Sequence, residues 1–183
     1  MSKVYVFLAD GFEMIEGLTV VDIMRRAKID VVTVSIKDRK KVKSSHNVFI
    51  AADKTFEEVD FEDADMLVLP GGMPGTTNLG AYEPLTELLK KFYKEGRKIA
   101  AICAAPSVFG KLGFLEGRKA TSYPGFEEEL LGAEITEDAV VTDGNVTTSR
   151  GMGTAIDFAL NLTAQLTDAE TAEKIAKSII YKA

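Results

Sequence analysis

Residues 99–106, IAAICAAP, carry the pattern on which the fold prediction depends. Four apolar residues form a short run that is typical of a buried strand, and the run stops at Cys103. The small residues Ala104 and Ala105, followed by Pro106, lead into a helix-like segment. A strand that feeds a helix through so short a link predicts a sharp turn of the nucleophile-elbow kind, with the thiol exposed on it.

The placement of Cys103 allows two interpretations. At the start of a helix, the free N–H groups and the helix dipole favour a thiolate, and we expect a lowered thiol pKa there. A buried, inert cysteine is the alternative, because free cysteine is among the most buried residue types. This local pattern by itself leaves both interpretations open.

The rest of the chain alternates short apolar runs with amphipathic segments, which is typical of helices packed on a largely parallel sheet. We expect strands over residues 4–8, 31–36, 66–69 and 99–102, an extended piece over 47–51 and a hairpin around Asp143–Gly144–Asn145. We expect helices over residues 15–27, 84–95, 155–166 and 169–180. The charged segment 37–43 is predicted to be a solvated turn. These expectations define an α/β fold.

Size, charge and cysteine content narrow the functional classes. The 183 residues fit a single domain, 1–183, and the net charge of −6 disfavours nucleic acid as a steady partner. The apolar runs are shorter than the roughly 18 residues of a membrane span, so no membrane association is expected. The sole cysteine excludes an internal disulfide and the N-terminus has no secretory pattern, so we expect a cytoplasmic protein. No zinc-type spacing or phosphate-binding loop occurs, so neither a metal nor a cofactor is expected.

Polar and glycine residues follow several predicted strands, where a parallel sheet gathers its ligand-binding loops. Gly71 and Gly72 follow the run at 66–69, and their N–H groups could face an oxyanion near the thiol. A plain turn explains these glycines nearly as well.

Four strings together resemble the DJ-1/ThiJ/PfpI family: ADGFEMIE at 9–16, LPGG at 69–72, AAICAAP at 100–106 and TSRGMGT at 148–154. The resemblance covers nearly the whole chain. It implies a flavodoxin-like three-layer sandwich with a mostly parallel central sheet, a homodimer, and a strained nucleophile elbow at Cys103.

The resemblance also implies that Cys103 is hydrogen-bonded by a carboxyl group, which the motif places at Glu16. A thiolate and a carboxylate in contact cannot both be ionised at low cost, so we expect Glu16 to have a raised pKa and to remain protonated. The alternative is that Glu16 only occupies the first turn of a helix, where the dipole favours acids.

The sequence departs from the family pattern at two positions where many members carry histidine, now Ala104 and Tyr123. Ala104 argues against the protease branch. Tyr123 is no base at neutral pH, because a phenol holds its proton there. We expect Tyr123, Pro124 and Arg150 to shape the pocket and the N–H groups of Gly72 and Ala104 to steady an oxyanion.

Two further residues match positions near the interface of similar proteins. The sole histidine, His46, is expected at an interface or on the surface, where it is no catalytic base. Arg26 and Arg150 match basic positions that could hold a phosphate or carboxylate, and ordinary surface ion pairs are the alternative.

The resemblance implies a cysteine-dependent, stress-protective function of the glyoxalase or protein deglycase type, acting on methylglyoxal-type dicarbonyls or their glycated adducts. In this interpretation Cys103 is the nucleophile and Glu16 the acid and base. The alternative is a peroxide-responsive redox sensor or chaperone-like protein, in which Cys103 is oxidised to sulfinic acid with little or no turnover. The sequence leaves open whether the chain is an enzyme.

Overall fold

A seven-stranded sheet forms the centre of the computed structural model, which describes residues 2–181. The strand order is β10-β11-β7-β6-β1-β2-β5, and every neighbouring pair is parallel except the hairpin β10–β11. The strands are β1 (Lys3–Leu8), β2 (Asp30–Ser35), β5 (Lys54–Thr55), β6 (Met66–Leu69), β7 (Lys98–Ile102), β10 (Val140–Asp143) and β11 (Val146–Ser149). The mostly parallel sheet predicted from the sequence is confirmed.

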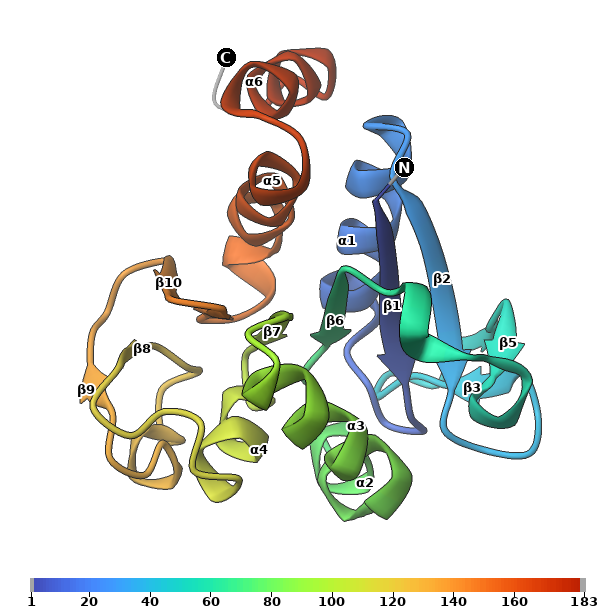
Figure 1. Cartoon of the computed structure of the whole chain (residues 1–183). Helices are drawn as coiled ribbons and strands as arrows, with labels where there is room; N and C mark the ends of the chain where they lie inside the picture. Colours follow the sequence, from blue (N-terminus) through green and yellow to red (C-terminus); the bar gives the residue numbers. More distant parts are fainter. Residues whose placement is uncertain (1, 182–183) are drawn as a thin grey trace.

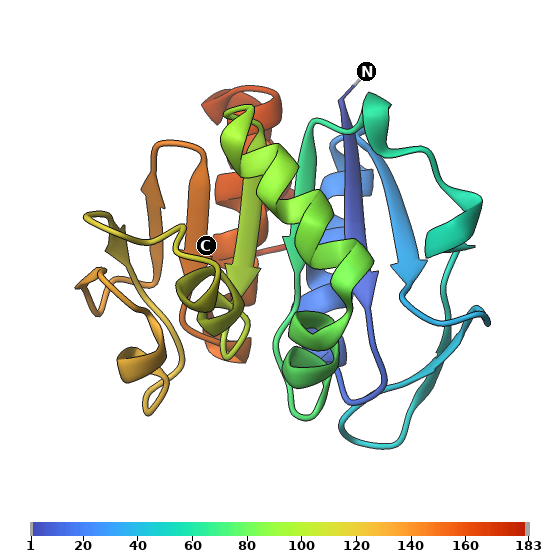
Figure 2. The same ribbon diagram turned by 60° about the horizontal axis from the view of Figure 1, so that its bottom comes forward.

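Helices cover both faces of this sheet and complete three layers (Figures 1 and 2). On one face, α1 (Met14–Arg26) packs beside α5 (Ala155–Leu166), which in turn contacts α6 (Ala169–Ser178). On the other face lie α2 (Gly75–Ala81), α3 (Glu83–Lys94) and α4 (Pro106–Lys111). The flavodoxin-like sandwich is therefore confirmed. The four helices predicted over residues 15–27, 84–95, 155–166 and 169–180 begin and end within about one turn of the observed α1, α3, α5 and α6, and the short helix α2 was not predicted.

Alternation of side chains along the strands divides the interior into two cores. In β1, Val4 and Val6 point into the core with α1 and α5, whereas Tyr5 and Phe7 point into the core with α2, α3 and α4. The run in β6 is buried at every position, as a strand with helices on both faces requires.

The prediction of a solvated turn over residues 37–43 is wrong for its last three residues. β3 (Lys41–Lys43) pairs antiparallel with β4 (Phe49–Ala51), with Val42 opposite Ile50. Val42 is fully buried between two exposed lysines, an inside–outside alternation that the density of charge concealed. The extended piece predicted over residues 47–51 is confirmed as β4.

The remaining elements are short. They are β8 (Lys119–Ala120), β9 (Glu134–Ile135), and the 3-10 turns η1 (Phe56–Glu58), η2 (Phe61–Asp63), η3 (Glu127–Glu129) and η4 (Met152–Thr154). α4 lies against η3 at Gly110, where a Cβ atom would come within 2.0 Å of the carbonyl oxygen of Glu129. This backbone contact fixes α4, the helix that follows Cys103, against the segment 123–130.

The helices described between residues 2 and 181 include none that is both long and apolar enough to span a membrane. Over the same residues, His, Cys, Asp and Glu side chains form no group of three placed to hold a metal ion.

Candidate active site

Cys103 occupies a strained turn at the carboxyl end of β7, a central strand of the sheet. Its φ angle is +68°, in the left-handed region that residues other than glycine rarely adopt. Its N–H donates to the carbonyl of Ser149 on neighbouring β11 (2.9 Å), and its own carbonyl accepts from the N–H of Tyr123 (2.9 Å). These two bonds hold the backbone on both sides of the turn, so that the strain persists and the thiol remains half-exposed.

Glu16 reaches the same point from the first turn of α1. Its side chain is 1% exposed, and Glu13, which caps the helix through the N–H of Ile15, sets the start of this turn. Oε2 accepts the N–H of Gly71 (2.9 Å), and the carboxyl group is hydrogen-bonded to the thiol of Cys103. The carboxyl group is therefore committed to the sulfur, which the helix-dipole alternative does not explain.

Gly71 lies between the acid and the thiol and leaves no room for a side chain. A Cβ atom there would come within 2.5 Å of Cβ of Cys103 and 2.7 Å of Oε2 of Glu16. The sequence prediction that the Gly71 N–H faces an oxyanion is wrong, because this N–H is already donated to Glu16. Gly71 therefore positions the acid.

The remaining two predicted donors do face the sulfur. The backbone N–H groups of Gly72 and Ala104 hydrogen-bond to Cys103 and lower its pKa. Gly72 has a φ angle of +88°, and a Cβ atom there would meet the backbone of Glu13 at 2.3 Å, so only glycine fits this close approach. The sulfur therefore has two N–H donors and one carboxyl group around it.

The electrostatics of the pair differ from the expectation in one respect. Burial raises the pKa of Glu16 to about 7, as expected, against the opposing hydrogen bonds to Cys103 and Gly71. Burial and the negative charge of Glu16 raise the pKa of Cys103 to about 12, so the predicted low thiol pKa is wrong. The loss of water around the sulfur outweighs the two N–H donors. The two groups are hydrogen-bonded to each other, so Glu16 as a carboxylate is placed to take the proton of the thiol.

Of the three residues predicted to shape the pocket, Tyr123 has contacts that bring it close to the pair. Tyr123 is 50% exposed, and its ring lies over Gly151, where a Cβ atom would be 3.2 Å from the ring and 4.0 Å from Oε1 of Glu16. Pro124 is exposed directly after Tyr123. Arg150 is half-buried between Ser149 and Gly151, and its guanidinium makes no ion pair within residues 2–181.

Arg26 and His46 lie apart from the sulfur. Arg26 is in the last turn of α1, about 15 Å along the helix from Glu16, and pairs with Asp22 at 2.7 Å. The surface ion pair that we considered for it is therefore present. The His46 side chain is 72% exposed, and its Nδ1 lies 3.3 Å from Oε2 of Glu13.

Sequence reasoning missed the roles of Ser149 and Gly151, although both lie in the string at 148–154. Ser149 anchors the amide of Cys103 because β11 is the parallel neighbour of β7. Strand order is a tertiary property, and no local pattern in the sequence encodes it. Gly151 is a third glycine at the site, after Gly71 and Gly72. Its role could have been inferred only from the four strings taken together.

Comparisons with known proteins identify the family of the chain. The sequence profile of the DJ-1/PfpI family matches residues 2–165. The chain is 37% identical over 183 residues to Protein DJ-1 homolog B of Arabidopsis thaliana, covering 99% of this chain and 42% of that protein, so it spans less than half of that relative. It is 34% identical over 154 residues to a protein named deglycase from Pyrococcus abyssi, covering 82% of this chain and 91% of that protein.

A solved structure, described as Toxoplasma gondii DJ-1, oxidized, superimposes with a TM-score of 0.95 at 38% identity, covering all of both chains.

The raised pKa of Glu16 predicts a stability that falls as the pH rises. The unfolded carboxyl group ionises near pH 4.5 and the folded one near 7, so between these values the unfolded state binds fewer protons and the free energy of unfolding decreases with pH. The shift corresponds to about 3 kcal/mol. Glu16→Gln keeps an acceptor for Gly71 and removes the ionisation, so we expect its stability relative to wild type to increase by about that amount from pH 4.5 to 8.

Denaturant unfolding at the two pH values measures this difference. The matched control is Asp22→Asn, which removes a carboxylate from the exposed side of the same helix. A Glu16→Gln effect that does not change with pH would show that Glu16 has the same proton affinity in the folded and unfolded states.

Proposed function

The chain belongs to the DJ-1/PfpI family, and from this premise we propose that it is a cysteine-dependent, stress-protective enzyme that converts methylglyoxal-type dicarbonyls to hydroxy acids. Cys103 acts as the nucleophile and Glu16 as the acid and base. The single observation that carries the proposal is the buried hydrogen bond between these two side chains.

Glu16 has the acidity that a proton shuttle needs at neutral pH. Burial holds its pKa at about 7, so both protonation states are accessible there. As a carboxylate it takes the thiol proton when Cys103 attacks, which overcomes the raised pKa of the sulfur. As an acid it then returns this proton to the oxygen that becomes negative.

The proposed steps start with a bond between the sulfur of Cys103 and the aldehyde carbon of the substrate. The C=O π electrons move to oxygen, which accepts the proton from Glu16 and gives a hemithioacetal. Glu16 then removes the hydrogen on the same carbon, its bonding electrons form the C=C bond of an enediolate, and the hydroxyl proton of the hemithioacetal passes to the oxygen on the neighbouring carbon. Return of the proton to the neighbouring carbon leaves a thioester, which water cleaves to the hydroxy acid and the free thiol. The net change is addition of one water, with no external oxidant or reductant.

The N–H groups of Gly72 and Ala104, which hydrogen-bond to the sulfur at rest, are the donors nearest to the developing oxyanion. In this proposal Tyr123, Pro124 and Arg150 form a wall of the substrate pocket, and the guanidinium of Arg150, which has no ion pair within residues 2–181, suits a carboxylate product. The relative named deglycase extends the proposed substrates to glycated adducts, in which the same carbonyl carbon carries an amine or thiol.

Lactate release from methylglyoxal tests the proposal. We expect Cys103→Ser to reduce kcat/KM at least about 1,000-fold, because a hydroxyl is a far weaker nucleophile, and Glu16→Gln to reduce it by about 100-fold or more through loss of the shuttle. Wild-type kcat/KM should rise with pH through about 7 as Glu16 becomes a base. Asp22→Asn is the matched control on the same helix. Equal lactate release from Cys103→Ser and wild type excludes the proposal.

A second candidate function is peroxide sensing through Cys103. The observation that favours it is the half-exposed sulfur with two N–H donors and one carboxyl group around it, which could hydrogen-bond the oxygens of a sulfinate. The raised thiol pKa opposes it, because the thiolate is the form that peroxide oxidises.

Mass spectrometry of the intact protein after mild peroxide treatment tests this candidate. Two equivalents of peroxide would convert the thiolate to sulfinate and release two waters, so a two-oxygen adduct on Cys103 should dominate. Glu16→Gln should reduce its yield severalfold by removing the proton acceptor, whereas Asp22→Asn should not. A Cys103 that stays unmodified eliminates peroxide sensing.

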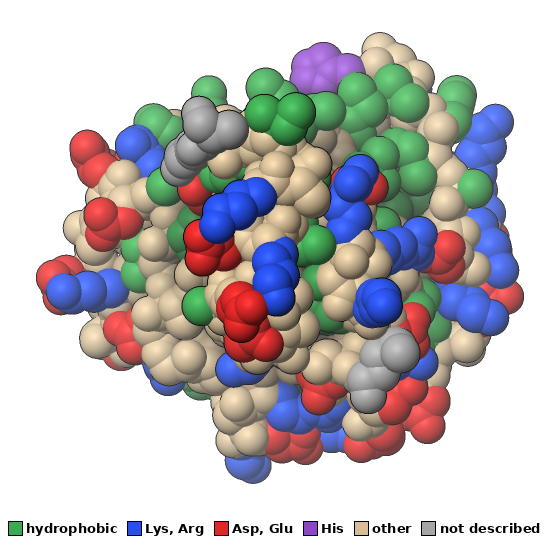
Figure 3. Space-filling view, turned by 90° about the horizontal axis from the view of Figure 1, so that it is seen from above, with side chains coloured by type: hydrophobic (Ala, Val, Ile, Leu, Met, Phe, Trp, Pro, Cys, Tyr) green, Lys and Arg blue, Asp and Glu red, His purple; other side chains and the backbone are tan. Residues whose placement is uncertain are grey.

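We further propose that the chain acts as a homodimer in the cytoplasm, where thiols stay reduced. Val48 and Phe49 are 43% and 58% exposed close to His46 in the sequence, and Figure 3 shows hydrophobic side chains gathered beside this histidine. Ile15 adds a 44% exposed side chain from α1. So many apolar side chains on one face are typical of a protein interface.

Sedimentation velocity at micromolar concentration measures the assembly. We expect a dimer in the wild type and a shift of about tenfold or more toward monomer in Phe49→Glu. Leu131→Glu is the matched control, because Leu131 is 55% exposed on another part of the chain. A monomeric wild type would rule out the dimer.

A further inference from the structure

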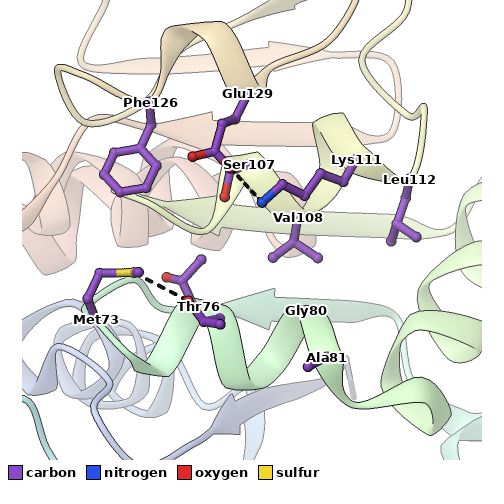
Figure 4. Close-up of a pocket in the computed structure, with 11 residues that line it drawn as sticks. Met73, Thr76, Gly80, Ala81, Ser107, Val108, Lys111, Leu112, Phe126 and Glu129 are labelled. Atoms are coloured by element: carbon purple, nitrogen blue, oxygen red, sulfur yellow. Dashed lines mark hydrogen bonds and ion pairs between the residues drawn. The ribbon is translucent and has the colours of Figure 1, made fainter.

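A cavity of about 310 Å³ lies between α2 and α4, outside the cluster around Cys103. The wall on the side of α2 consists of Met73, Thr76, Gly80 and Ala81. Figure 4 shows the facing wall on the side of α4, which consists of Ser107, Val108, Lys111 and Leu112. Phe126 and Glu129 close it from the segment that ends in η3. Its volume suits a small molecule or one arm of a larger one.

This cavity begins next to both N–H donors of the sulfur. Met73 directly follows Gly72, and the hydroxyl of Ser107 donates to the carbonyl of Ala104 (2.7 Å). On the third side, the N–H of Phe126 donates to the carbonyl of Tyr123 (3.1 Å), whose own N–H donates to the carbonyl of Cys103 (2.9 Å). The backbone segments that hydrogen-bond to the sulfur at Gly72 and Ala104 therefore continue directly into two walls of this cavity.

The residues that line the cavity favour an uncharged, mostly apolar ligand. Most of it is apolar, and Lys111 and Glu129 pair with each other at 2.6 Å, so neither presents an unbalanced charge. The side chain of Thr76 is 4% exposed, and its hydroxyl has no hydrogen-bond partner in the described part of the chain. A buried hydroxyl without a partner is unfavourable, and one neutral polar atom in the cavity would satisfy it.

We propose that this cavity binds the apolar arm of a carbonyl substrate whose reactive carbon lies at Cys103, and that a hydroxyl or carbonyl in the arm hydrogen-bonds to Thr76. The inference rests on the proposed function for turnover and names its substrate class: uncharged 2-oxoaldehydes with an aliphatic or aromatic arm longer than a methyl group. Each methylene that enters the cavity strengthens binding about fourfold.

Alkylation of Cys103 tests the cavity without requiring turnover. The probes are iodoacetamide and N-hexyl iodoacetamide, for which sulfur forms the new bond to carbon, iodide leaves and Glu16 accepts the thiol proton. We expect the hexyl probe to react at least about tenfold faster with the protein, after both rates are divided by those with mercaptoethanol. Equal normalised rates would overturn the proposal.

Two exposed positions fill the cavity with little risk to the fold. Thr77 and Ala81 lie on the solvent side of α2 and line the cavity. Thr77→Phe or Ala81→Phe should therefore reduce the ratio of the normalised rate with N-hexyl iodoacetamide to that with iodoacetamide to near one. The matched control is Ala169→Phe, at an exposed position that starts α6, which should keep the wild-type ratio. A ratio unchanged in both α2 variants also overturns the proposal.

The role of Thr76 has its own measurement. The probes are N-hydroxyalkyl iodoacetamides whose alkyl chains have two to six carbons. The probe whose hydroxyl reaches Thr76 should react about fivefold faster with wild type than with Thr76→Val, because one hydrogen bond has about this effect on binding. The same ratio at every length would remove the polar contact from the proposal. Because these are alkylation rates, a chain that releases no lactate but shows the length dependence would refute the proposed enzyme and retain the cavity.

Discussion

The contact of the Gly71 backbone with both Glu16 and Cys103 is the constraint on which the site depends. The N–H of Gly71 holds one carboxyl oxygen, and the absence of a side chain lets the thiol and the acid meet at the end of the sheet. The sharp turns at Gly72 and Cys103, with φ angles of +88° and +68°, are the conformations that keep these backbones so close. The strain at Cys103 is maintained by the bonds from Cys103 to β11 and from Tyr123 to Cys103, whereas glycine adopts the positive φ at residue 72 without strain.

Burial at this contact determines how charge is distributed. Two acids that share a small, poorly hydrated space cannot both be ionised at low cost, so the pair keeps at least one proton at neutral pH. Burial raises the pKa values of both groups, and the negative charge of Glu16 raises that of Cys103 further. The sulfur is thus protected as a thiol until a reacting carbon draws its proton onto Glu16.

Much of this arrangement could be predicted from the sequence, because its signals are local. The apolar run before Cys103, the glycines after residues 66–69 and the acid of the first predicted helix turn each mark the end of a strand or the start of a helix. The family resemblance added the pairing of Glu16 with Cys103. What failed depends on tertiary structure: Gly71 and Gly72 look alike in sequence, yet their N–H groups bond to different side chains. Likewise, the thiol pKa follows from the loss of water that only packing produces, and Val42 was hidden among lysines.

The two sides of the sheet contribute different parts of the site. Glu16 arrives from α1 on one face, whereas the cavity between α2 and α4 belongs to the opposite face. The seven-stranded sheet separates these two sets of helices. Proton transfer and ligand shape are thus encoded by separate parts of the polypeptide. A designer, or natural divergence, can remodel one wall to accept new molecules while the chemistry supplied from the other stays intact.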